Sequence, residues 1–283
     1  MKILARVPLH VSGIWIPVEK SSLRHTGSLG AGLNLEIYLE ASPLTTRECS
    51  IVLNNEKILV DHASYMCSKT SISIGITAYS PIGLGVGYGV SAASLLALAL
   101  IMSKYANRDS LLEHVVLAHE AEVKYRTGLG DVIAEYYGGA EIRVKPGPPG
   151  IGAIEQIKYK EPVRILACIL GSSESTPVML SRVKREIYDY GYKLYRELLE
   201  NPVLEVFFEK AQLFTRRIFD YTQIDELLSH SSGVNGYYRK KQALIVWVEN
   251  DYLYDIFEKL KESGIKCFIT SIDKSGARIV HTP

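Results

Sequence analysis

The first candidate site is a glycine-rich loop that runs into an apolar helix. From Gly83 to Gly89 a glycine occupies every second position, and an Ala/Leu-rich segment follows from Ser91. Glycine loses more backbone entropy on ordering than any other residue, so this density indicates close approach of the backbone to a ligand. A helix N-terminus presents unpaired N–H groups and positive dipole charge to an anion. We therefore predict a phosphate site, with the Ser91 hydroxyl available to phosphate or Mg²⁺, formed by Pro81, Gly83, Gly85, Gly87, Gly89, Ser91 and Ala92.

Glycine-rich loops also occur in simple turns and in nucleotide sites of other kinds. A tight strand-to-helix turn needs only one or two glycines. The P-loop class of nucleotide sites requires Gly-Lys-Ser/Thr, and no lysine follows these glycines. A dinucleotide site is the alternative, because Gly87-x-Gly89-x-x-Ala92 fits its relaxed pattern and Asp109 follows about 20 residues later. Against it, that acid should end a second strand, whereas Asp109 is predicted to lie between two helices.

Three acidic residues form the second candidate site. Glu120 and Glu122 lie late in a predicted helix, and Asp131 ends the turn Thr127-Gly128-Leu129-Gly130-Asp131. Phosphoryl transfer from Mg-ATP uses one carboxylate on the metal and one near the attacking hydroxyl. The residues alone favour an ordinary helix surface and turn, because exposed glutamates and Gly-Asp turns are both common.

Short strands and two helices are predicted to position these residues. The pair Asn54-Asn55 between two apolar runs predicts a hairpin turn. A strand over 71–79 leads into the glycine loop, and a buried helix over 91–105 follows it. Asp109 is predicted as the N-cap of the helix that carries the glutamates.

A cluster of chain breakers, PGPPG at residues 146–150, separates two halves of the chain. With 283 residues the chain is long enough for two fused lobes. We predict an N-terminal ATP-binding domain over 1–150 and a C-terminal α/β domain over 151–283.

The amino-acid composition limits the kinds of partner that we expect for the chain. The chain has 47% hydrophobic and 22% charged residues, which suits a globular protein, and its net charge is +1. We therefore expect a small-molecule substrate, with neither nucleic acid nor a membrane as partner, and leave a homodimer open. The apolar stretch Ala92–Met102 is shorter than the roughly 20 residues of a membrane span. The N-terminus lacks a signal-peptide pattern, so we expect a cytoplasmic protein.

The cysteines are far apart and lack the paired spacings of zinc or redox sites. We expect them to be small buried hydrophobic residues in a reducing compartment, without partners. They are Cys49, Cys67, Cys168 and Cys267.

The two candidate sites together resemble those of the GHMP kinases, in the form found in archaeal pantoate kinases of coenzyme A biosynthesis. The proline, the glycines and Ser-Ala-Ala-Ser at the helix start resemble the family's phosphate motif, and the TGLGD string resembles its acidic turn. The resemblance implies a two-lobe α+β GHMP fold, with the active site between the lobes and Mg-ATP as phosphoryl donor. It implies that Ser91 and Glu122 hold Mg²⁺, with Glu120 as the alternate ligand. It also implies that Asp131 orients or deprotonates the substrate hydroxyl.

The N-terminal segment carries the acceptor side of the resemblance. The string GSLGAG at 27–32 resembles the family's GSxGAG turn, which borders the acceptor pocket, although a hairpin explains the bare residues equally well. Leu29 stands where the family often has a basic residue, so we expect Arg24 to substitute. The substrate-binding candidates are Ser28, His119, Arg143 and Arg24. Arg143 is favoured for a carboxylate, because a guanidinium can hold one through two parallel hydrogen bonds.

The activity implied by the resemblance is the ATP-dependent phosphorylation of pantoate to 4-phosphopantoate. Two alternatives stay open: another GHMP kinase acting on homoserine or a mevalonate-pathway alcohol, and a GHMP-fold binding protein without catalysis. The presence of both Glu122 and Asp131 favours an enzyme, since a sensor needs no metal ligand and base together.

Overall fold

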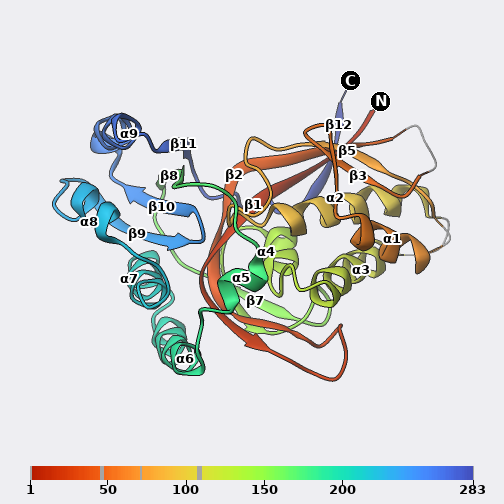
Figure 1. Cartoon of the computed structure of the whole chain (residues 1–283), viewed down its shortest axis with the longest axis horizontal. Helices are drawn as coiled ribbons and strands as arrows, with labels where there is room; N and C mark the ends of the chain where they lie inside the picture. Colours follow the sequence, from red (N-terminus) through yellow and green to blue (C-terminus); the bar gives the residue numbers. More distant parts are fainter. Residues whose placement is uncertain (1, 45–47, 71, 107–109, 283) are drawn as a thin grey trace.

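A computed structural model describes residues 2–44, 48–70, 72–106 and 110–282, and it places them in two lobes (Figure 1). Each lobe is built on its own β-sheet, of eight strands in the first lobe and four in the second among the described residues. Helices cover both sheets (Figure 1). The predicted α+β, two-lobe architecture is confirmed.

Two long antiparallel strands form the centre of the first sheet. They are β1 (Lys2–Val18) and β2 (Gly27–Pro43). The path of the sheet runs β12-β1-β2-β5-β3-β4, and β6 and β7 branch from β2. The shorter strands are β3 (Ile51–Leu53), β4 (Glu56–Ile58), β5 (Ile76–Tyr79), β6 (Ala140–Lys145), β7 (Ala153–Gln156) and β12 (Arg278–Thr282). The hairpin predicted at Asn54-Asn55 is confirmed between β3 and β4, where both residues have positive φ.

Helices cover β1 on both faces. On one face lie α1 (Val60–Ser68), α2 (Val90–Tyr105), α3 (Leu111–Lys124) and α4 (Asp131–Tyr137) (Figure 1). Helix α2 is apolar all round, and its residues from Ala92 to Met102 are buried, because it packs against β1, β2 and α3. On the other face, α7 of the second lobe packs close to Gly13, where a Cβ atom would lie 2.5 Å from Ala211.

The second lobe is an antiparallel sheet in the order β11-β8-β10-β9. Its strands are β8 (Arg164–Ile169), β9 (Val234–Lys240), β10 (Ala243–Val248) and β11 (Lys266–Thr270). Its helices are α5 (Thr176–Leu180), α6 (Arg185–Glu200), α7 (Leu204–Thr215), α8 (Thr222–Leu228), the 3₁₀-helix η1 (Asn250–Tyr252) and α9 (Leu253–Glu262). Buried tyrosines connect the lobes: Tyr88 donates to the Cys168 carbonyl and Tyr238 donates to the Val11 carbonyl.

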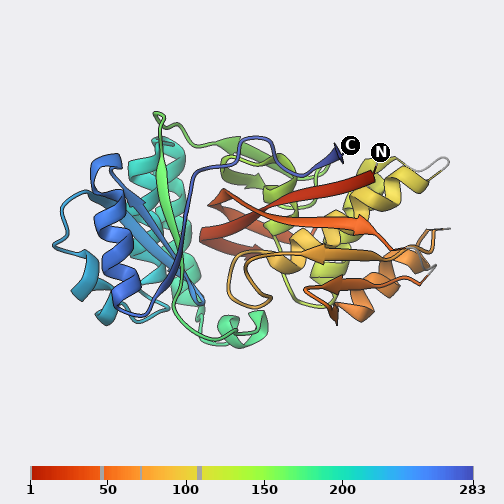
Figure 2. The ribbon, with the colours of Figure 1, turned by 90° about the horizontal axis from the view of Figure 1, so that it is seen from above.

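The sheets do not divide at residue 150. Strand β7 still pairs with β6 of the first sheet, and β12 returns to pair with β1. Figure 2 shows the blue C-terminal segment passing back from the second lobe to the first. The first strand of the second sheet begins at Arg164 and its last strand ends at Thr270, so the second lobe is built from this part of the chain.

Two further expectations concern the helices. Helix α3 begins after Ser110, which forms a capping box with Glu113. Asp109, the predicted N-cap, lies outside the described residues, and the cap is Ser110 instead. Within the described part of the chain, no helix has the length and apolar character needed to cross a membrane.

The expectation of unpaired cysteines is wrong. Cys49 is bonded to Cys67, and Cys168 is bonded to Cys267. The second pair lies directly opposite on the neighbouring strands β8 and β11, although 99 positions separate the two residues in sequence. Strand pairing, which spacing in the sequence does not reveal, brings these cysteines together.

Reduction of the disulfides is expected to lower the free energy of unfolding. A disulfide restricts the unfolded chain, by about 3 kcal/mol for a 15-residue loop and about 4.7 kcal/mol for a 100-residue loop on the chain-entropy account. The loops here have sequence separations of 18 and 99. Urea unfolding with and without dithiothreitol measures the difference, and thiol titration of the denatured, unreduced protein should detect no free thiol. Four titratable thiols would contradict both pairings.

Candidate active site

A cavity of about 880 Å³ lies between the two lobes. The first lobe contributes the glycine-rich loop and the turn over 127–131, and the second contributes residues 173–181 together with Lys240 and Lys241. Because both lobes supply walls, the cavity has the predicted position of the active site.

The glycine-rich loop owes its shape to three glycines. Gly85, Gly87 and Gly89 have φ values of 83°, 115° and 68°, which side chains other than glycine rarely adopt. A Cβ atom on Gly87 would also lie 2.3 Å from the Lys240 carbonyl oxygen, and one on Gly89 would lie 2.2 Å from Glu135 Oε1. The glycines thus let the loop pack against the second lobe and against α4.

The loop leads into helix α2, and the first turn of this helix lies at the cavity. Gly89 caps this helix without a side-chain hydrogen bond, and Val90 and Ser91 line the cavity. Of the residues predicted to bind phosphate, those on the cavity wall are Gly85, Gly87, Gly89 and Ser91. Pro81, Gly83 and Ala92 are absent from that wall, and Ala92 is buried in the core. The part of the loop suited to phosphate therefore begins after Gly83.

Glu122 is a buried carboxylate with one oxygen free. Its Oε1 accepts hydrogen bonds from Ser91 Oγ at 2.7 Å and Thr127 Oγ1 at 2.5 Å, whereas its Oε2 has no partner among the described residues. Burial raises the pKa of Glu122 to about 7, although these two hydrogen bonds oppose the increase. A buried carboxylate oxygen without a partner is costly, so this atom is suited to a cation.

Asp131 faces the same space as Glu122. The position that a Cβ atom would take on Gly128 lies 2.0 Å from Glu122 Oε2 and 3.5 Å from Asp131 Oδ2. Burial alone would raise the pKa of Asp131, but the Lys240 ammonium, 3.3 Å away, and His10 outweigh it and hold this pKa well below its ordinary value. Asp131 is therefore ionised at neutral pH.

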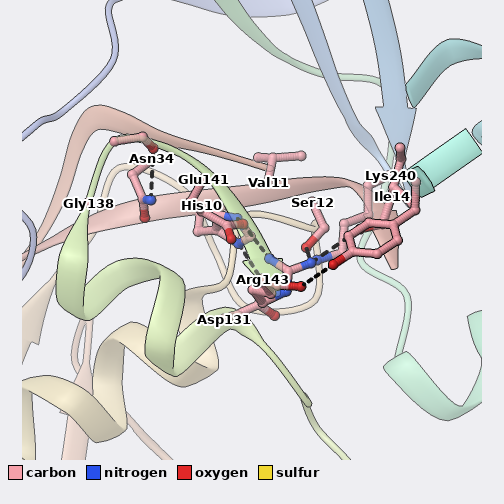
Figure 3. A network of polar contacts seen from close by, with 12 residues as sticks. His10, Val11, Ser12, Ile14, Asn34, Asp131, Gly138, Glu141, Arg143 and Lys240 are labelled. Carbon is pink, nitrogen blue, oxygen red and sulfur yellow. Dashed lines mark hydrogen bonds and ion pairs between the residues drawn. The ribbon is translucent and has the colours of Figure 1, made fainter. Parts of the chain in front are cut away.

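A network of buried polar side chains contacts Asp131 (Figure 3). His10 Nδ1 lies 2.7 Å from Asp131 Oδ1, and His10 Nε2 lies 3.0 Å from Glu141 Oε1. Arg143 donates to Glu141, and its Nη2 group donates to Ser12 Oγ at 3.3 Å. Because His10, Glu141 and Arg143 are almost fully buried, the network fixes the orientation of Asp131.

The residues present fit a magnesium ion. Mg²⁺ is usually held by one or two carboxylates together with substrate phosphates and water, so a complete protein cage is not required. Among the described residues there is no group of three or more His, Cys, Asp or Glu side chains suited to hold a metal. The free Oε2 atom of Glu122, with the Ser91 hydroxyl beside it, offers the small ligand set that Mg²⁺ needs.

Comparison with known proteins identifies the family. The model of the GHMP kinases N terminal domain matches residues 57–139. The pantoate kinase of Thermococcus kodakarensis is 33% identical over 231 residues, which cover 77% of this chain and 76% of that protein. The chain belongs to the pantoate kinases of the GHMP kinase family. It is therefore an ATP-dependent small-molecule kinase, and the dinucleotide and binding-protein alternatives are set aside.

Further similarities agree with membership of the pantoate kinases. The pantoate kinase of Methanocaldococcus jannaschii is 30% identical, and the match covers 71% of this chain and 74% of that protein. A solved structure described as "Phosphotransferase related to CoA biosynthesis pathway" is 27% identical and superposes with a TM-score of 0.82 over 99% of both chains. The α+β GHMP fold is thus confirmed over the length of the chain.

The choice between the two glutamates favours Glu122 for the metal. Glu120 accepts hydrogen bonds from Arg24 Nε at 2.5 Å and from the Tyr65 hydroxyl at 2.8 Å, and it does not line the cavity. Glu122 does not line the cavity either, but among the described residues its Oε2 has no partner and lies close to Gly128, which does line the cavity, whereas both oxygens of Glu120 are paired.

The four substrate-binding candidates are not brought together. Ser28 lines the cavity. Arg24 pairs with Glu120, and His119 is buried with its Nε2 2.9 Å from the Thr26 carbonyl oxygen; neither lines the cavity. Arg143 does not line the cavity either; it lies against Gly130, which does. A direct hold on a substrate carboxylate by these three residues stays a prediction, and the contacts present give Arg143 a supporting role.

Sequence reasoning missed several residues of this site. His10 and Glu141 lie in strands whose register places them behind Asp131. Lys240 and Lys241 enter from the second lobe. One signal was present for the lysines, because the run Arg239-Lys240-Lys241 stands between two apolar strand segments. The histidine and glutamate carried no comparable local signal.

Replacement of Ser91 by Ala is expected to lower kcat roughly tenfold or more, because the hydroxyl that donates to Glu122, and that we predict to bind Mg²⁺, is lost. Stability should fall by only about 1 kcal/mol, the usual value of one hydrogen bond. Ser103→Ala is the matched control, since Ser103 lies on the same helix and donates to the Leu100 carbonyl. Steady-state kinetics at several Mg²⁺ concentrations measure the effect, and equal kcat in Ser91→Ala and wild type would remove Ser91 from the site.

Proposed function

We propose that the chain transfers the γ-phosphoryl group of Mg-ATP to pantoate, giving ADP and 4-phosphopantoate for coenzyme A biosynthesis. The observation that carries the proposal is that Glu122 and Asp131 face one space over Gly128, beside the glycine-rich loop. Phosphoryl transfer needs this pair, one carboxylate at the metal and one at the attacking hydroxyl. The acceptor is taken from the pantoate kinases to which the chain is similar.

In this proposal the phosphates lie against the backbone of the loop and the start of α2, and Glu122 and Ser91 hold Mg²⁺. When bound there, the metal would neutralise negative charge on the phosphates of ATP. The predicted division into an ATP-binding domain over 1–150 and a second domain over 151–283 is kept as part of the proposal for the placement of the nucleotide site, although β7 and β12 of the second part pair in the first sheet. A cytoplasmic location is part of it as well, since ATP is the donor.

Asp131 orients the acceptor hydroxyl. Because its pKa is held well below the ordinary value, Asp131 is a weak base for a free hydroxyl. It therefore accepts a hydrogen bond from the hydroxyl first, and takes the proton only as the bond to phosphorus forms. The buried contacts of Asp131 with His10 and Lys240 keep its carboxylate in place for this role.

Basic side chains on the cavity wall suit two anionic reactants. In the described part of the chain they are Lys20, Arg126, Lys240 and Lys241, and the same wall carries the acidic residues Glu19, Asp131 and Glu174. The cavity is therefore mixed in charge, and the pantoate carboxylate and the ATP phosphates would pair with its basic side chains. Ser28 borders the acceptor side, where its hydroxyl lies beneath Gly130.

An acceptor screen tests the proposal. ADP release is measured with pantoate, homoserine, mevalonate and pantothenate under identical Mg-ATP. We expect kcat/KM for pantoate to exceed that for each other compound by at least about tenfold, because a site that pairs particular polar groups rejects substrates lacking them. Faster turnover of homoserine or mevalonate would overturn the assignment of the acceptor while leaving the kinase activity in place.

A further inference from the structure

The β9–β10 hairpin of the second lobe carries two adjacent lysines directly onto the glycine-rich loop. Strand β9 ends at Lys240, and Lys241 has a φ value of 54°, so the chain turns sharply at this point. Gln242 N donates to the Val86 carbonyl at 3.0 Å, and Gly87 lies so close that a Cβ atom there would meet the Lys240 carbonyl. The hairpin and the loop that faces phosphate are therefore held in a fixed relation.

Both lysines are buried at the cavity wall. Lys240 is 8% exposed and Lys241 is 6% exposed, which is rare for lysine. Lys240 Nζ lies 3.3 Å from Asp131 Oδ1, and Lys241 Nζ donates to Thr176 Oγ1 at 2.8 Å. An ammonium group has three N–H donors, and each lysine makes one of these contacts with the described residues. Each retains donors for an anion in the cavity.

The surroundings favour an anion between these ammonium groups. Burial, followed by repulsion from Lys240, lowers the pKa of Lys241 to about 8, while Asp131 and Glu122 act in the opposite direction. Two buried cations side by side repel each other, and a bound anion would relieve that repulsion. The anion must lie close to Asp131, because Lys240 contacts that carboxylate.

We propose that Lys240 and Lys241 are catalytic residues that bind the non-bridging oxygens of the transferred γ-phosphoryl group. This inference rests on the proposed function. In the step, the acceptor oxygen bonds to the γ-phosphorus while the bond from phosphorus to the β–γ bridging oxygen breaks. ADP leaves with that electron pair, and the hydroxyl proton passes to Asp131 and then to solvent. The lysines exchange no proton; they stabilise the charge on the phosphoryl oxygens.

The test compares Lys240→Met and Lys241→Met with the control Lys274→Met, which removes an exposed lysine paired with Glu161. Two quantities are measured for each variant. The first is kcat with the acceptor that the screen identifies. The second is the gain in affinity for ADP and Mg²⁺ on adding aluminium fluoride, which mimics the phosphoryl group in transfer, measured by calorimetry.

We expect each cavity variant to lose roughly a hundredfold or more in kcat, the scale of one lost donor to a developing charge, and to lose most of the aluminium fluoride gain. Affinity for ADP alone should stay within about threefold, and the control should match wild type. Unchanged kcat would overturn the proposal. A variant with low kcat that keeps the full gain in affinity from aluminium fluoride would also overturn it, because the lysine would then act only through its neighbours.

Two features keep the test decisive. Lys241 contacts Thr176 and has no acidic partner within ion-pair distance among the described residues, so Lys241→Met tests the proposal if Lys240→Met does not fold. The aluminium fluoride measurement needs no acceptor, so it separates failure of this inference from failure of the pantoate assignment. Aluminium fluoride binding that is strong in wild type and equally strong in both folded variants would overturn the role of the lysines whichever acceptor is used.

Discussion

Asp131→Asn is expected to lower kcat by roughly a hundredfold to ten-thousandfold, the range of lost general-base assistance. Asparagine keeps the size of the side chain and can still accept a hydrogen bond. It removes the charge that Lys240 and His10 hold in place, and it cannot take the hydroxyl proton. On the proposed mechanism the loss falls on the reacting hydroxyl, and nucleotide affinity should survive.

The measurement is single-turnover phosphorylation of pantoate, with ADP affinity determined in parallel. Asp225→Asn is the matched control, because Asp225 pairs with Arg216 at a site that does not line the cavity. Both variants are assayed well below their melting temperatures, since the Asp131 variant leaves Lys240 without its ion-pair partner and His10 with only one of its two acidic contacts. Equal turnover in Asp131→Asn and wild type would make Asp131 a turn residue only, and the mechanism would fail even though the family stands.

The features that could be predicted from the sequence were local ones. Alternating glycines before an apolar run predicted the loop and the helix at 91–105, and α2 occupies Val90–Tyr105. Positive φ at both Asn54 and Asn55 explains why that pair marked a hairpin. Each of these features depends on neighbouring residues, because backbone preference and helix termination act over a few positions.

The features that were missed depend on register and on contacts between lobes. Asp131 meets His10 across 121 positions and Lys240 across 109. His10 pairs with Asn34 in a stretch of β1 between two shifts of the register on β2, at Pro8/Leu9 and Ser12/Ile14. The disulfide between Cys168 and Cys267 depends in the same way on the pairing of β8 with β11. No spacing in the sequence reports such pairings.

Arg143 shows that a residue type can indicate which group it binds, while its position in the fold decides which group is within reach. A guanidinium suits a carboxylate, and this one does bind a carboxylate, but it is that of Glu141 within the protein. Burial between β2 and α4 follows from the pairing of Arg143 with Gly30 in the sheet and from the closeness of Gly130. The sequence identified a useful side chain, and the fold showed one carboxylate that it meets; its hold on a substrate carboxylate stays a prediction.

Gly128→Ala is expected to abolish measurable turnover, with a loss in kcat of about a thousandfold or more. The new Cβ atom would lie 2.0 Å from Glu122 Oε2, so this carboxylate, the proposed metal ligand, must move. Displacement of about 1 Å at a reacting centre costs on the order of a hundredfold, and here the added methyl group also occupies the space shared with Asp131. Gly128 does not have positive φ, so its backbone tolerates alanine.

Since the backbone is compatible, Gly128→Ala should fold, and this separates a lost site from a lost structure. Gly171→Ala serves as the control: Gly171 is exposed, and its Cβ atom would meet only the end of the flexible Gln242 side chain, at 3.1 Å. Circular dichroism should show both variants folded, while Mg²⁺-dependent nucleotide binding and turnover should fall only in Gly128→Ala. A folded Gly128→Ala variant with wild-type kcat would show that the space between Glu122 and Asp131 is not where the metal and the acceptor hydroxyl meet, because a methyl group placed there could not leave both carboxylates at work.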